Sequence, residues 1–215
     1  MMHAYRQYYL EDALNVLGAA VESATMLFEV PLEKFWRIFL ASEQSLRFAK
    51  GDPFIIAGKS GWELACEVLE AAGEKFNHRR PDGLRPRTSD YWAGWALAQY
   101  QWYRGFTFQE IEEFAPIAAV VKLYFPFHEE TILQFYDELD RRYRERHPHT
   151  RLYEFRRRLG LTRDQLAAAA QVSSRLIEQY EQRRRDINSA RAETFLALAA
   201  ALMVSPRQLL ERVPT

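Results

Sequence analysis

The sequence predicts an all-α protein made of two domains. Apolar residues recur at helical spacing along the 215-residue chain, and most of these segments begin with a residue that favours a helix N-terminus. Charge separates the two parts: residues 151–215 hold 12 Arg and 7 acidic residues (12 − 7 = +5), whereas residues 1–150 hold 17 basic and 22 acidic residues (17 − 22 = −5). We therefore expect a basic domain joined to an acidic domain with a different task.

Residues 1–146 are expected to form a multi-helix bundle. Two capping boxes, Ser60 with Glu63 and Thr107 with Glu110, mark helix starts within it. The polar segment 74–89 is the longest expected loop, because it is rich in proline and charge. The expected helices cover, in order, residues 8–28, the segments around Phe35 and Phe48, Ser60 to Gly73, residues 90–104, the segment after Thr107, and residues 128–146.

A short linker at residues 147–150 is expected to end the bundle, because Pro148 disfavours a helical conformation at the residue before it. Residues 151–215 are then expected to form a second domain of five short helices. The first of these helices contains Leu152, the second is capped by Thr162 with Gln165, and the third starts at Ser173. The fourth covers residues 190–202, and the fifth starts at Ser205 with Pro206.

The second and third of these helices form a pair joined by a tight turn within residues 161–181. Apolar side chains at matching positions would hold the two helices at a steep angle, so that the polar face of the later helix projects outward. A protein needs that arrangement to place a helix in the major groove of DNA. The apolar positions are Leu166, Ala167, Val172, Ile177 and Tyr180.

Matches to one family pattern are spread over residues 151–211. They are Leu159-Gly160-Leu161-Thr162, Gln165-Leu166-Ala167, Val172-Ser173, Ile177, Tyr180-Glu181, Thr194-Phe195-Leu196, Leu198-Ala199, Leu202, Val204-Ser205-Pro206 and Leu209-Leu210. On these residues the region resembles the Xre/Cro/C1-type helix-turn-helix family of bacterial and phage DNA-binding domains. The resemblance implies a five-helix lambda-repressor-like fold, double-stranded DNA as the ligand, and binding as a homodimer.

Residues 1–150 resemble an uncharacterised all-helical region that precedes Xre-type modules in some bacteria. The segments that carry this resemblance are Tyr9-Leu10-Glu11-Asp12-Ala13, Gly51-Asp52-Pro53, Ser60-Gly61 and Tyr91-Trp92-Ala93-Gly94-Trp95. This resemblance implies no established activity.

The family resemblance also implies which residues meet DNA. Arg175 can donate two hydrogen bonds to a guanine edge, and Gln179 can pair in the same way with adenine. Arginines beside the recognition helix are expected to contact phosphates, which fixes register without reading sequence. The residues expected at the DNA interface are Thr162, Arg163, Ser173, Ser174, Arg175, Gln179, Gln182, Arg183, Arg184, Arg185 and Arg156.

Two features of this region leave alternatives open. Arg156 and Glu181 form an ion pair in similar domains, so Arg156 is expected either to be oriented toward a phosphate or to form a surface pair that contributes under about 1 kcal/mol. The family has glycine at the position of Gln171 and again near Arg183, because glycine accepts positive φ cheaply. Either the turn is displaced, or the loop after the recognition helix has a different shape.

An aromatic segment, residues 91–106, is the most unusual feature of the first domain. Trp92, Trp95, Gln99 and Trp102 share one helical face by their spacing. One interpretation is a core helix of the bundle. The other is a groove that binds a partner protein, because Trp and Tyr are enriched in interface hot spots.

The remaining sequence features favour a cytoplasmic protein without catalytic function. Cys66 is the single cysteine, so no internal disulfide can form, and a reducing compartment is expected. No apolar run is long enough to span a membrane, and the N-terminus lacks the pattern of a secretory signal. His147 and His149 have no ligand partners at metal spacing, so neither a metal site nor a cofactor is expected. We find no motif of an enzyme active site.

Three functions remain after these exclusions. The leading hypothesis is a sequence-specific transcriptional regulator, expected to act as a repressor, with residues 1–146 as a sensor or partner-binding domain. The alternative is an antitoxin, in which residues 1–146 neutralise a toxin and the C-terminal module represses the shared operon. A third is a small-molecule sensor that uses the aromatic helix as a pocket wall.

Overall fold

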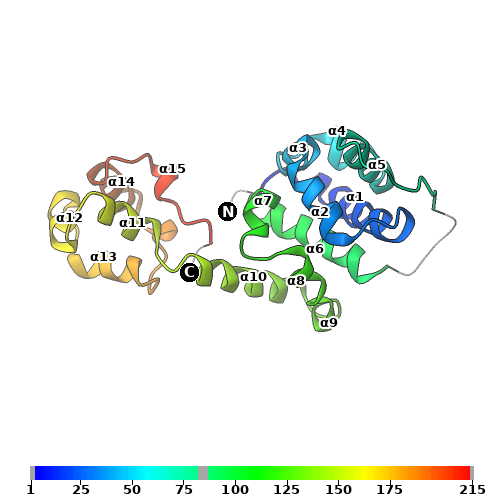
Figure 1. The fold of residues 1–215 in the computed structure, drawn as a ribbon. Helices are drawn as coiled ribbons and strands as arrows, with labels where there is room; N and C mark the ends of the chain where they lie inside the picture. Colours follow the sequence, from blue (N-terminus) through cyan, green and yellow to red (C-terminus); the bar gives the residue numbers. More distant parts are fainter. Residues whose placement is uncertain (1–2, 82–86, 214–215) are drawn as a thin grey trace. The chain divides into compact units, whose positions relative to one another are not determined.

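The computed structural model describes residues 3–81 and 87–213, and in these parts of the chain every regular element is helical. The all-α prediction is thereby confirmed. The chain divides into two compact units, unit 1 at Met1–Arg142 and unit 2 at Tyr143–Thr215 (Figure 1). Within the described ranges, no helix combines the length and the apolar character needed to cross a membrane.

Unit 1 has a helix in each predicted segment and, in addition, short helices at residues 53–56, 117–121 and 124–127 that were not predicted. Both capping boxes are present, at Ser60 with Glu63 and at Thr107 with Glu110. Residues 74–81 and 87–88 are not helical, in agreement with the predicted loop, of which residues 82–86 lie outside the described residues. The elements are η1 (Gln7–Tyr9), α1 (Leu10–Glu22), the π-helical turn η2 (Ser23–Leu27), α2 (Leu32–Ala41), α3 (Glu43–Ala49), α4 (Pro53–Ile56), α5 (Gly61–Ala71), α6 (Ser89–Arg104), α7 (Phe108–Glu112), α8 (Ile117–Val121), α9 (Tyr124–Phe127) and most of α10 (Ile132–Arg146).

Helix α1 is the centre of unit 1, where it packs along α6 and α5 (Figure 1). Glycines allow this close approach, because a Cβ atom on Gly94 would lie 2.8 Å from the Leu17 carbonyl oxygen, and one on Gly61 would lie 2.5 Å from the Val16 carbonyl oxygen. The close packing leaves α1 with seven buried residues and no room for larger side chains at these contacts.

A buried polar cluster attaches the first part of α10 to α6. Tyr100 donates a hydrogen bond of 2.8 Å to Asp140 Oδ1, and Arg104 forms an ion pair with the same carboxylate. Asp140 is 2% exposed, so its charge depends on these donors rather than on water. This face of α10 is therefore buried, although the helix is rich in charged residues.

Unit 2 contains the end of α10 and the predicted short helices. The linker at 147–150 is not helical, as expected, but the boundary between the compact units precedes it, inside α10. The main-chain carbonyls of His147 and His149 accept hydrogen bonds from Arg183 of unit 2, so this segment belongs to the unit's fold rather than forming a free tether. The elements are α11 (Arg151–Arg158), α12 (Arg163–Ala170), α13 (Ser174–Glu181), η3 (Ile187–Ser189), α14 (Ala192–Ala201) and α15 (Pro206–Leu209).

Candidate nucleic-acid interface

The turn between α12 and α13 begins at a left-handed residue. Gln171 ends α12 with φ +51°, and Arg183, which follows α13, has φ +54°. These are the two positions where the family resemblance expects glycine. Neither a displaced turn nor an altered loop is needed, because Gln171 and Arg183 themselves adopt the left-handed conformation.

Helices α12 and α13 both begin at the capping residues that the sequence predicts. Thr162 and Gln165 form a capping box at α12, and the Ser173 hydroxyl accepts a hydrogen bond of 3.2 Å from the Leu176 main-chain N–H. The Thr162 and Ser173 side chains cap their helices and are also exposed to solvent. Both helix N-termini therefore begin at the positions that the sequence predicts.

Side chains beneath the turn form the core of unit 2. Ala167, Ile177 and Tyr180 are buried there, and Val172 packs against them. Ala167 is small enough to let α12 and α13 come into contact, as the sequence predicts. Because this apolar face points inward, the opposite face of α13 is left at the surface.

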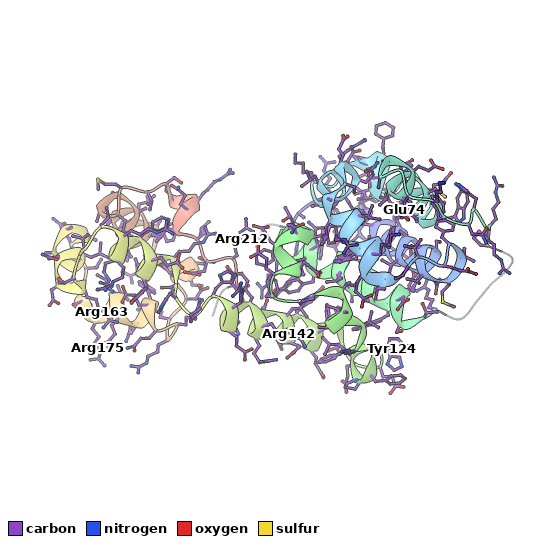
Figure 2. All side chains as sticks on the ribbon, in the orientation of Figure 1. Glu74, Tyr124, Arg142, Arg163, Arg175 and Arg212 are labelled. Atoms are coloured by element: carbon purple, nitrogen blue, oxygen red, sulfur yellow. The ribbon has the colours of Figure 1, made fainter. Side chains whose placement is uncertain are left out.

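The outward face of α13 carries polar and charged side chains. Arg175 and Gln182 are exposed, while Ser174 and Gln179 are half-buried. Figure 2 shows Arg163 and Arg175 along the edge of unit 2 where α13 lies. The predicted base-contacting residues are therefore together on one accessible helical face.

Glu178 lies on the same face and was missed by sequence reasoning. It follows Arg175 by three residues and precedes Gln182 by four, and Gln182 Nε2 donates to Glu178 Oε1 at 3.1 Å. The spacing of a helix would have revealed it. A carboxylate here opposes phosphate, but it can accept a hydrogen bond from a cytosine amino group.

Glu181 is a buried carboxylate that joins three helices. Arg156 of α11 donates to it through Nε at 2.5 Å and through Nη2 at 3.1 Å, and Arg156 Nη1 donates to the Leu161 carbonyl oxygen at 2.7 Å. The Arg156 and Glu181 side chains are 6% and 1% exposed. The expectation of a surface pair is therefore wrong, and so is the expectation that Arg156 faces a phosphate, because its guanidinium is enclosed by protein.

Arg163 shares the same carboxylate from a more open position. Its Nε donates to Glu181 Oε2 at 2.7 Å, and its side chain is 37% exposed. This hydrogen bond raises the pKa of the Arg163 guanidinium. Glu181 thus holds Arg163 at the N-terminus of α12 while part of its guanidinium remains accessible to an anion.

The three arginines after α13 differ in their environments. Arg183 turns inward, where it donates to the linker carbonyls and lies 3.7 Å from Glu211. Its predicted contact with phosphate is therefore not supported, because these partners hold its guanidinium and its side chain is only 14% exposed. Arg184 and Arg185 are exposed and remain candidates for phosphate contact.

The aromatic face of α6 in unit 1 is only partly open. Trp102 is 7% exposed, it donates from Nε1 to the Tyr5 carbonyl oxygen at 2.8 Å, and it stacks on His3. Trp92 and Trp95 are half-buried beside a hollow of about 300 Å³ that Tyr124 also lines. A partner-binding groove that includes Trp102 is therefore wrong, since its indole is already covered, whereas Trp92, Trp95 and Gln99 retain some accessible surface.

Comparisons with protein-family models, with curated proteins and with solved structures found no match to this chain. A functional conclusion therefore depends on the residues and the geometry described above.

Proposed function

We propose that this chain is a sequence-specific DNA-binding protein that regulates transcription, acting as a repressor. In this proposal unit 2 is a five-helix lambda-repressor-like module with α12 and α13 as its helix-turn-helix, and unit 1 is a sensor or partner-binding domain. One observation carries the proposal: α13 buries Ile177 and Tyr180 while it presents Arg175 and Gln179 outward. That division suits a helix that enters the major groove.

Each accessible side chain has a separate task in this proposal. Arg175 and Gln179 contact base edges, and each bidentate contact discriminates against a wrong base by roughly 1–3 kcal/mol. Arg163, Arg184 and Arg185 contact phosphates, which orient the helix. The hydrogen bond from Arg163 to Glu181 restricts its side chain in advance, so less conformational freedom is lost when phosphate binds.

A homodimer is part of the same proposal. One short helix offers few base contacts, so linking two copies raises affinity because the second contact becomes intramolecular. Related modules bind pseudo-palindromic sites whose halves lie about 34 Å apart, one turn of the duplex. We expect the preferred site of this protein to show that symmetry.

Selection from a random pool of DNA duplexes tests the proposal, followed by competition binding with point variants. Arg175→Ala should relax selectivity at one base pair per half-site. Arg184→Ala should weaken binding to every duplex alike and reduce the slope of log K against log salt by about 0.9. If the wild-type chain enriches no sequence, or if Arg175→Ala causes only a uniform loss, the proposal is wrong.

A further inference from the structure

A cavity of about 550 Å³ opens in unit 1 among helices α2, α7 and α8. Helix α2 contributes Glu33, Arg37 and Leu40, which follow one another at spacings of four and three residues and so share one face. Glu112 at the end of α7 and Ile117 at the start of α8 form the opposite wall. This volume is within the range of pockets that bind small molecules.

Glu112, which lines this cavity, is held through one of its two carboxylate oxygens. Trp36 Nε1 donates to Oε2 at 2.8 Å, and the Ile117 main-chain N–H donates to the same oxygen at 3.1 Å. Oε1 accepts no hydrogen bond from any residue that the structure describes, and it is not among the polar atoms sealed from solvent. The carboxylate is thus fixed through one oxygen, while the other is available to a donor.

Arg37 provides the opposite charge on the α2 side of the cavity. Its side chain is exposed, and no described acidic group lies within ion-pair distance of it, although Glu33 is one turn away on the same helix. Leu40 and Pro116 add apolar surface to the same cavity. Within the described residues, a carboxylate oxygen of Glu112 that accepts no hydrogen bond, the unpaired Arg37 guanidinium and an apolar surface therefore line the same cavity.

We propose that this cavity binds a free amino acid with an apolar side chain. The ammonium group donates to Glu112 Oε1, the carboxylate accepts from Arg37, and the side chain packs on Leu40 and Pro116. A simple amine would leave Arg37 unpaired, and a simple carboxylic acid would leave Glu112 unpaired. The inference goes beyond DNA binding and concerns unit 1 alone, so either proposal can fail without the other.

Calorimetric titration of the full-length chain with valine, leucine, isoleucine, methionine and phenylalanine tests this inference. We expect saturable binding of at least one of them. The amine and the carboxylic acid that correspond to the tightest ligand should each bind about tenfold or more weakly, because each lacks one charge-assisted hydrogen bond. Equal affinity for the amine, or no binding of any of the five at about 10 mM, would overturn the proposal.

Variants identify the site of binding. Glu112→Gln keeps an acceptor for Trp36 and Ile117 but removes the charge, and Arg37→Gln changes an exposed side chain, so circular dichroism should show the helix content of both unchanged. Each should lower amino-acid affinity about tenfold or more. Glu113→Gln and Arg6→Gln are matched controls at exposed positions outside the cavity lining, and they should bind like the wild type. If Arg37→Gln binds as tightly as the controls, the assignment is wrong.

Discussion

At the scale of single residues, burial decides which charged groups stabilise the fold and which remain accessible to a ligand. Arg156 and Arg163 both donate to Glu181, but only Arg163 keeps exposed atoms. Arg183 and Arg184 are neighbours in sequence, and only Arg184 is exposed. Sequence reasoning assigned all four to DNA, because residue type and motif position do not reveal the direction of a long flexible side chain.

Removing Arg156 should destabilise unit 2 strongly. Arg156→Ala leaves Glu181 buried with Arg163 as its remaining cation, and loss of one partner of a buried pair typically costs about 3–5 kcal/mol. Urea denaturation followed by circular dichroism measures the effect. Arg157→Ala, at the exposed neighbouring position, should stay within about 0.5 kcal/mol of wild type. Equal stability of the two variants would show that the buried pair is not needed for folding.

Glu112 should make the stability of unit 1 depend on pH. Burial raises the pKa of its carboxyl above the ordinary value of 4.5, so the folded state binds this proton more tightly than the unfolded state. The contribution to stability is therefore complete below pH 4.5 and is lost as the pH rises through the raised pKa. Glu112→Gln should gain stability relative to wild type between pH 4 and pH 7. Denaturant titrations at both pH values measure this change, and an unchanged difference would contradict it.

At the scale of elements, the helices follow local signals closely. The capping residues Ser60, Thr107, Thr162 and Ser173 all begin helices where the sequence predicts them, because a cap acts on main-chain groups two or three residues away. Longer segments were less predictable. The helix expected at residues 8–28 begins with a 3-10 turn and ends with a π-helical turn, and the helix expected at 128–146 begins at Ile132.

The left-handed residue between α12 and α13 offers a test at this scale. Gln171 is exposed and has φ +51°, a conformation that costs a residue with a Cβ roughly 1 kcal/mol or more. Gln171→Gly should therefore raise the stability of unit 2 by about 0.5–1 kcal/mol. Arg183→Gly removes the same backbone strain but also loses two hydrogen bonds to the linker, so it should not stabilise. Thermal unfolding compares them, and equal gains would contradict this account.

At the scale of the whole molecule, charge is divided unequally between the compact units. Residues 143–215 hold 14 basic and 8 acidic residues (14 − 8 = +6), whereas residues 1–142 hold 15 and 21 (15 − 21 = −6). The chain is neutral as a whole. Its non-specific attraction to DNA therefore depends on whether the DNA phosphates interact with the positive charge of residues 143–215 without also being repelled by the negative charge of residues 1–142. Screening weakens the influence of distant charges as salt increases.

A truncated chain tests this division. Residues 143–215 alone should bind a random duplex several-fold more tightly than the full-length chain at about 50 mM salt, because 6 net negative charges are removed. The difference should shrink by about 0.3 M salt, where the Debye length falls below 8 Å. Fluorescence anisotropy over a salt series measures it. Tighter binding by the full-length chain at every salt concentration would indicate that unit 1 itself contacts DNA.

The sequence by itself determined the all-α class, most helix starts and the polar outward face of α13, because periodicity and capping are properties of neighbouring residues. Only the tertiary structure decided that Arg156, Arg183 and Trp102 are enclosed, and that Glu112 and Arg37 line one cavity. These outcomes depend on contacts between distant residues, such as Arg156 with Glu181 at a separation of 25 positions and Trp36 with Glu112 at a separation of 76. Such contacts form only when helices pack, so no local pattern encodes them.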